Sequence, residues 1–115
     1  MSIDMDILKA LLSFRALSQE TRLKALKLLV AHGKSGVAAG ILSEQLGIPH
    51  NTLSFHLSHL SDAGLVLSKK RGRQMIYFVN FETITNLMGF LAENCCAAEG
   101  TTCHDMDKLT QGTTC

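Results

Sequence analysis

Residues 42–66, LSEQLGIPHNTLSFHLSHLSDAGLV, hold two runs that suit short helices and a break between them. Within the break, LGIP, Gly47 closes the first run and Pro49 prevents that helix from continuing. The pattern predicts one helix over residues 37–46 and a second over about residues 50–63. Two short helices joined by such a turn form a candidate helix-turn-helix.

The second of these helices has two unlike faces. Its apolar residues recur at helical spacing and are expected to face the core: Leu53, Leu57 and Leu60. The opposite face is mostly uncharged and polar: Asn51, Ser54, Phe55, Ser58 and His59. A major groove admits an α-helix, and side chains of this kind can hydrogen-bond to base edges there. The helix is therefore a candidate for reading DNA.

A basic hairpin is predicted directly after this helix. Two short β-prone runs, LVLSKK and QMIYFVN, flank a turn that contains Gly72. The tip carries four cations: Lys69, Lys70, Arg71 and Arg73. Cations at this place can neutralise DNA phosphates beside a helix lying in the groove. The alternative, two core helices beside a solvated hairpin, explains this combination less well.

Length and charge distribution agree with a small DNA-binding protein. The chain has 115 residues, 46% of them hydrophobic, which suits one domain with a modest core. Residues 1–80 carry ten Lys and Arg against five Asp and Glu, whereas residues 81–115 carry one against five. A basic body beside an acidic tail favours a polyanionic partner. No signal peptide or membrane-spanning run is recognisable, so we expect a cytoplasmic protein without a membrane partner.

Three further helices are predicted outside the helix-turn-helix. The first covers residues 3–14 and places five apolar residues on one face: Ile3, Ile7, Leu8, Leu11 and Leu12. The second, capped by Ser18 and running through His32, is expected to turn four residues inward: Leu23, Leu26, Leu29 and Val30. The last begins at about Phe81, ends at Gly100 and carries an apolar stripe: Ile84, Leu87, Met88, Leu91 and Cys95.

Three segments together resemble the ArsR/SmtB family of metal-responsive bacterial repressors: RALSQETRLKALKLL at 15–29, the stretch 42–66, and KKRGRQMIYFV at 69–79. The resemblance implies a dimeric winged helix-turn-helix fold, mainly α with a β-hairpin wing, whose first and last helices form the dimer interface. It also implies contacts to double-stranded operator DNA from the start of the second short helix: His50, Asn51, Thr52, Ser54 and Phe55. Phe55 stands where the family usually has a polar residue, and we expect it to contact a thymine methyl group.

Two metal sites known in that family are absent here. One uses Cys-x-Cys at the start of the first short helix, where this chain has Ala38 and Gly40. The other uses Asp and His along the last helix, and residues 81–92 contain neither. We therefore divide the chain into a DNA-binding and dimerisation domain, residues 1–93, and a sensor tail, residues 94–115.

The tail holds every cysteine of the chain: Cys95, Cys96, Cys103 and Cys115. A disulfide between the adjacent pair is disfavoured, because neighbouring Cα atoms are only ~3.8 Å apart. Thiolates select soft ions, and three sulfurs suit trivalent arsenic or antimony. A vicinal pair with a third downstream cysteine is similar to the site of arsenite-responsive family members. We expect Cys95, Cys96 and Cys103 to bind As(III), the inducer, and Sb(III) as a possible substitute.

Several alternatives stay open. His104 beside the three cysteines would complete a four-ligand zinc site, and three thiolates also suit Cd²⁺ or Pb²⁺. Oxidation of the same thiols would make a redox sensor, and Cys95 could simply pack in the core. An enzyme is not expected, because no Cys-x-x-Cys or activating base accompanies the thiols. His56 and His59 lie three residues apart, which fits a metal, but we expect one at the core boundary and one near DNA phosphates.

Overall fold

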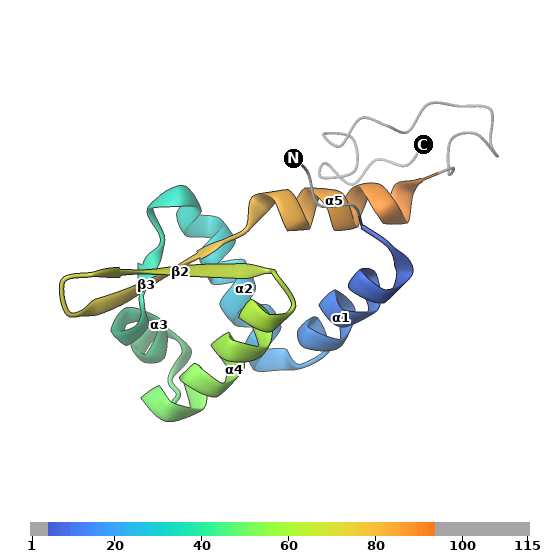
Figure 1. Ribbon diagram of the computed structural model, residues 1–115. Helices are drawn as coiled ribbons and strands as arrows, with labels where there is room; N and C mark the ends of the chain where they lie inside the picture. Colours follow the sequence, from blue (N-terminus) through green and yellow to red (C-terminus); the bar gives the residue numbers. More distant parts are fainter. Residues whose placement is uncertain (1–4, 94–115) are drawn as a thin grey trace.

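The computed structural model describes residues 5–93 (Figure 1). In chain order the elements are α1 (Ile7–Leu17), α2 (Glu20–His32), the 3-10 turn η1 (Gly33–Ser35), β1 (Val37–Ala38), α3 (Ala39–Leu46), α4 (His50–Asp62), β2 (Val66–Arg71), β3 (Gln74–Val79) and α5 (Phe81–Ala92). The strands form one antiparallel sheet in the order β1-β3-β2. The fold is a winged helix-turn-helix, mainly α with a β-hairpin, as the sequence predicts.

The core lies where α2, α3 and α4 meet the sheet. Its fully buried side chains are almost all leucines: Leu29, Leu42, Leu53, Leu57, Leu60 and Leu65. The three leucines of α4 follow the predicted spacing, so one side of this helix is fixed by apolar burial. Burying a leucine side chain contributes about 1.5–3 kcal/mol, which makes this face the main restraint on the orientation of α4.

The turn between α3 and α4 forms as predicted. Gly47 ends α3 at φ 68°, a left-handed conformation that favours glycine. The Ile48 N–H donates to the Ser43 carbonyl at 3.2 Å, and the Ser43 hydroxyl donates to the Ile48 carbonyl. Pro49 then precedes α4. These bonds satisfy the end of α3 and set the direction in which α4 leaves.

One strand was missed, and the first helix of the motif is shorter than predicted. The prediction placed a helix over residues 37–46, but Val37 and Ala38 instead pair with Tyr77 and Ile76 as β1. Gly36, at φ 76°, brings the chain against β3 so closely that no side chain fits. Pairing across the fold therefore outweighs the local helical pattern at these two residues.

Two expectations about α2 are corrected. Ser18 does not cap α2: it ends α1, while the Gln19 side chain accepts the Arg22 N–H at 2.8 Å. Leu23 and Val30, expected inside, are 45% and 43% exposed, because the core-facing positions of α2 are Ala25, Leu26 and Leu29.

The last helix, α5, ends at Ala92 rather than at Gly100. Glu93 leaves the helical conformation, with φ −58° and ψ 129°, and the residues that follow, Asn94 and Cys95, are weak helix formers. The predicted place of Cys95 on the stripe of this helix lies outside the described residues. Between residues 5 and 93 no helix combines the length and apolarity needed to cross a membrane.

Candidate nucleic-acid interface

The outer face of α4 is exposed along the first turns of the helix. Each predicted reading residue lies there: His50, Asn51, Thr52, Ser54 and Phe55. The core leucines hold the opposite side, so these residues form one surface of a fixed helix. Phe55 is 57% exposed, so its ring is accessible on this surface.

The start of α4 leaves backbone donors open. Pro49 occupies the N-cap position and provides no side-chain hydrogen bond to the first turn. The Asn51 side-chain oxygen accepts the Thr52 N–H at 3.0 Å. Free N–H groups at a helix N-terminus favour an anion, and a DNA phosphate satisfies that preference.

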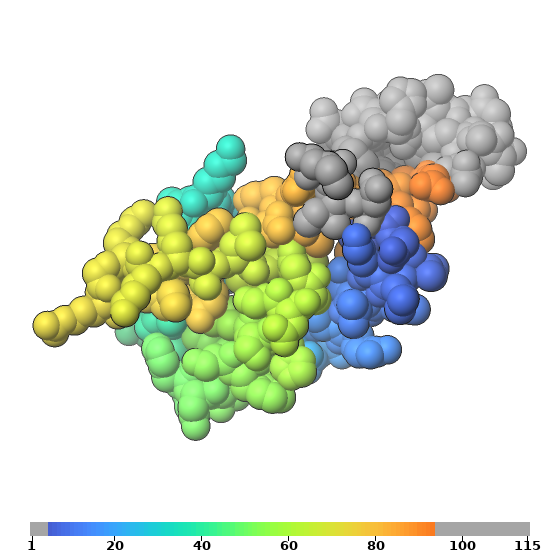
Figure 2. Space-filling model, in the orientation of Figure 1, coloured from blue at the N-terminus to red at the C-terminus, as the bar shows by residue number. Residues whose placement is uncertain are grey.

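The hairpin of β2 and β3 projects from the body, as the space-filling view shows (Figure 2). Gly72 turns the chain at φ 64°, and all four predicted cations are exposed: Lys69, Lys70, Arg71 and Arg73. None of these four cations forms an ion pair with a carboxylate of residues 5–93, whereas Lys24 on α2 is paired with Glu20. The cations of the hairpin are available to phosphates.

A contact network behind α4 supports Phe55. The Arg22 Nε donates to His56 Nδ1 at 3.1 Å, and the guanidinium carbon of Arg22 lies 5.8 Å from the centre of the Phe55 ring. The ring of His59 packs edge-on against Phe55 with centres 4.6 Å apart. The sequence analysis gave Arg22 no role, so its part in positioning Phe55 was missed. Its partner is 34 residues away in sequence, which no helical pattern reveals.

His56 is buried and His59 exposed, in agreement with one histidine at the core boundary. Burial lowers the pKa of His56, and the positive charges of Arg22 and His59 lower it further. The neutral ring suits the Arg22 contact, because only an unprotonated Nδ1 can accept a hydrogen bond.

This pKa shift predicts that the folded state loses stability in mild acid. The unfolded chain binds a proton at His56 below about pH 6.5, while the folded chain resists protonation down to its lowered pKa. The free energy of unfolding should therefore fall as pH decreases through that window. Urea unfolding between about pH 7.5 and 5.5 measures the slope. His56→Gln should flatten the slope, whereas His59→Gln, which removes only the smallest of the three causes of the shift, should flatten it less; equal slopes in the two variants would contradict this account.

The predicted thiolate ligands, Cys95, Cys96 and Cys103, lie outside the described residues, as do His104 and Cys115. Among residues 5–93 there is no group of three or more His, Cys, Asp or Glu side chains that could hold a metal ion.

An exposed polar helix, a basic hairpin and a buried leucine face define a winged helix-turn-helix DNA-binding protein. Residues 17–68 match the helix-turn-helix domain family. The chain is 35% identical over 79 residues to the uncharacterized HTH-type transcriptional regulator YceK of Bacillus subtilis, covering 68% of this chain and 78% of that one. It is 32% identical to the arsenical resistance operon repressor of the same organism, covering 72% of this chain and 75% of the repressor. The chain belongs to the ArsR family of transcriptional regulators.

Solved structures agree with this assignment. An ArsR-like transcriptional regulator from Rhodococcus sp. RHA1 superposes with a TM-score of 0.67 at 27% identity, covering 91% of this chain and 89% of that one. A homodimeric winged helix-turn-helix DNA-binding domain from Mycobacterium bovis has the same fold, with a TM-score of 0.59 at 24% identity over 84% of this chain and 88% of that one.

Proposed function

We propose that the protein is a homodimeric repressor that releases its operator when As(III) binds Cys95, Cys96 and Cys103, with Sb(III) as a substitute. The observation that carries the proposal is the position of the thiols. Cys95 follows α5 closely in the sequence, and the N-cap residue of α5, Asn80, is linked by hydrogen bonds through Leu65 to the end of α4. The arsenical resistance operon repressor of B. subtilis, 32% identical to this chain, supports the choice of signal.

Exposed apolar surface supports dimerisation through α1 and α5. Large side chains on these two helices remain uncovered in the single chain: Ile7, Leu8, Leu11, Leu12, Met88 and Leu91. The two helices lie at the end of the molecule opposite the hairpin tip (Figure 1). A second copy would bury this surface and place two reading helices at a fixed separation, as successive major grooves require.

A series of hydrogen bonds links α5 to α4. The Asn80 side chain caps α5 by accepting the Thr83 N–H at 3.4 Å, and the Asn80 N–H donates to the Leu65 carbonyl at 2.9 Å. The Leu65 N–H in turn donates to the Leu60 carbonyl at 3.0 Å, within the last turn of α4. A shift of α5 would therefore move the reading helix. Binding of arsenic and of DNA must then weaken each other equally, and ~1–3 kcal/mol of coupling changes affinity by about 5–150-fold.

The test of the proposal is a titration of the reduced protein bound to fluorescent operator DNA. Arsenite, Cd²⁺, Zn²⁺ and peroxide are added separately, and anisotropy reports release. We expect arsenite to release DNA at the lowest concentration. Release by Cd²⁺ or Zn²⁺ at lower concentration would identify a different metal sensor, and release by peroxide alone would identify a redox sensor.

The hairpin predicts a specific loss of salt dependence. Replacing Arg71 and Arg73 with Ala should weaken operator binding and reduce the slope of log K against log salt by about 2, since each lost phosphate contact contributes ~0.9. A matched control removes two exposed cations elsewhere, Lys27 and Lys34, and should leave the slope nearly unchanged. If both double variants had the same slope, the hairpin cations would not contact DNA phosphates.

A further inference from the structure

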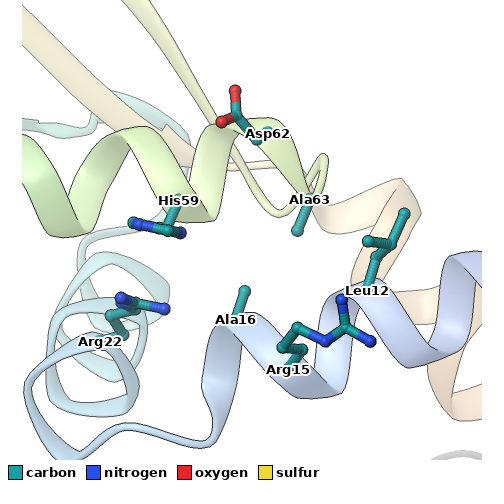
Figure 3. A pocket seen from close by; sticks show the side chains of 7 residues that line it. All are labelled: Leu12, Arg15, Ala16, Arg22, His59, Asp62 and Ala63. Atoms are coloured by element: carbon teal, nitrogen blue, oxygen red, sulfur yellow. The ribbon is translucent and has the colours of Figure 1, made fainter.

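A hollow of about 320 Å³ lies between α1, α2 and α4, at the far end of α4 from its reading residues (Figure 3). Its apolar lining comes from Leu12, Ala16 and Ala63. Its polar lining includes the Arg22 guanidinium on α2 and the His59 ring on α4 at one end, and the Arg15 guanidinium on α1 at the other end, turned toward Leu12 (Figure 3). Neither the reading surface nor the cysteine tail accounts for this combination.

The charge around the hollow is unbalanced. Neither Arg15 nor Arg22 forms an ion pair with a carboxylate of residues 5–93. Arg22 uses its Nε for His56, which leaves the terminal nitrogens of the guanidinium for another acceptor. Asp62 also lines the hollow, but its carboxylate oxygens point away from the other labelled side chains (Figure 3). The interior therefore offers cationic donors beside an apolar wall.

We propose that this hollow binds a small organic carboxylate. The carboxylate would accept hydrogen bonds from the terminal nitrogens of Arg22, because a guanidinium matches a carboxylate in a two-bond geometry, and the Arg15 guanidinium at the other end of the hollow would add a favourable charge. The apolar body of the ligand would rest against Ala16 and Ala63. The volume lies at the lower end of the range for ligand pockets, about 300–1,000 Å³, which limits the ligand to a compact molecule such as a small aromatic acid.

A ligand in this hollow would act on the DNA-reading surface. Arg22 holds His56 through Nε and lies beside Phe55, so an anion bound to the terminal nitrogens of the same guanidinium would shift or restrain these contacts. Arg15 belongs to α1, the helix assigned to the dimer interface. Occupancy would therefore connect the dimer interface to the recognition helix through a route separate from the cysteines.

The experiment uses the full-length reduced protein and benzoate as the probe, with the uncharged isostere benzamide for comparison. Binding is followed by amide chemical shifts and calorimetry at constant ionic strength. We expect saturable binding of benzoate, with shifts at Ala16 and Ala63, and at least tenfold weaker binding of benzamide. Equal binding of the two compounds, or of benzoate and inorganic phosphate, would overturn the proposal.

Two variants localise the binding. Arg15→Gln, at an exposed position, should weaken benzoate binding about tenfold, and Ala63→Leu should block the hollow without changing charge. Lys27→Gln removes an equal charge from the exposed side of α2 and should have no effect. If benzoate fails to bind and Arg15→Gln instead lowers the salt slope of operator binding, the guanidinium contacts the DNA backbone and the proposal is wrong. The arsenite titration depends on the cysteines, so its failure would be distinguishable.

Discussion

Replacing Cys95, Cys96 or Cys103 with Ser should abolish release of operator DNA by arsenite while leaving DNA binding intact. A serine hydroxyl is a hard, protonated ligand that does not replace a thiolate on a soft ion. All three residues lie outside residues 5–93, which contain the reading helix and the hairpin, so DNA affinity without arsenite should be unchanged. Anisotropy of labelled operator DNA, titrated with protein and then with arsenite, measures both properties.

Cys115→Ser is the matched control and should respond to arsenite like the unmodified protein. Cys103 comes seven residues after Cys96, and Cys115 comes nineteen residues after it. Closing the longer loop costs roughly 0.9 kcal/mol more, a four- to fivefold preference for Cys103. Loss of the response in Cys115→Ser, with Cys103 intact, would mean that the distal cysteine is the ligand. A normal response in Cys103→Ser would contradict the three-thiolate site.

Gly36→Ala should lower the free energy of unfolding by about 2–6 kcal/mol, a large part of the ~5–15 kcal/mol typical of a domain. Gly36 has φ 76° and ψ −177°, a conformation that only glycine adopts readily. An added Cβ would lie 2.7 Å from the Tyr77 carbonyl oxygen and 2.8 Å from Ile76 Cγ2. Because both residues pair with β1, relief of this contact would separate β1 from the sheet. Thermal and urea unfolding measure the loss.

Gly40→Ala provides the control for this substitution. Gly40 lies in α3, and an added Cβ there meets no atom within 4 Å. Alanine is the better helix former, so this variant should gain about 0.5–1 kcal/mol. If the two variants unfolded at the same urea concentration, β1 would be free to move away from β3, and the close approach at Gly36 would not constrain the fold.

The elements set by local pattern were predicted correctly. Leucines at helical spacing gave α4 its buried face, Gly47 and Pro49 placed the turn before it, and Gly72 placed the hairpin tip. These signals are carried by neighbours in sequence, because helix periodicity and turn geometry depend on a few consecutive residues. The exposed position of Asn51, Ser54 and Phe55 followed from the same pattern, since a buried face fixes the opposite one, whereas the DNA contacts of His50 and Thr52 were implied by the family resemblance.

The contacts between distant residues were not predictable in this way. Pairing of Val37 and Ala38 with β3 replaced a predicted helical turn, and the Arg22–His56 bond joined residues whose local patterns gave no sign of contact. Each depends on the packing of α2 and β3 around the core, which a one-dimensional pattern does not contain.

The sequence by itself determined the winged helix-turn-helix, its polar reading face and its basic hairpin, because apolar spacing, turn residues and charge are local properties. Only the tertiary structure decided how Phe55 is supported and where the hollow beside Arg15 and Arg22 lies. Those features arise where α1, α2 and α4 meet, and the position of a side chain at such a junction depends on the packing of all three helices together.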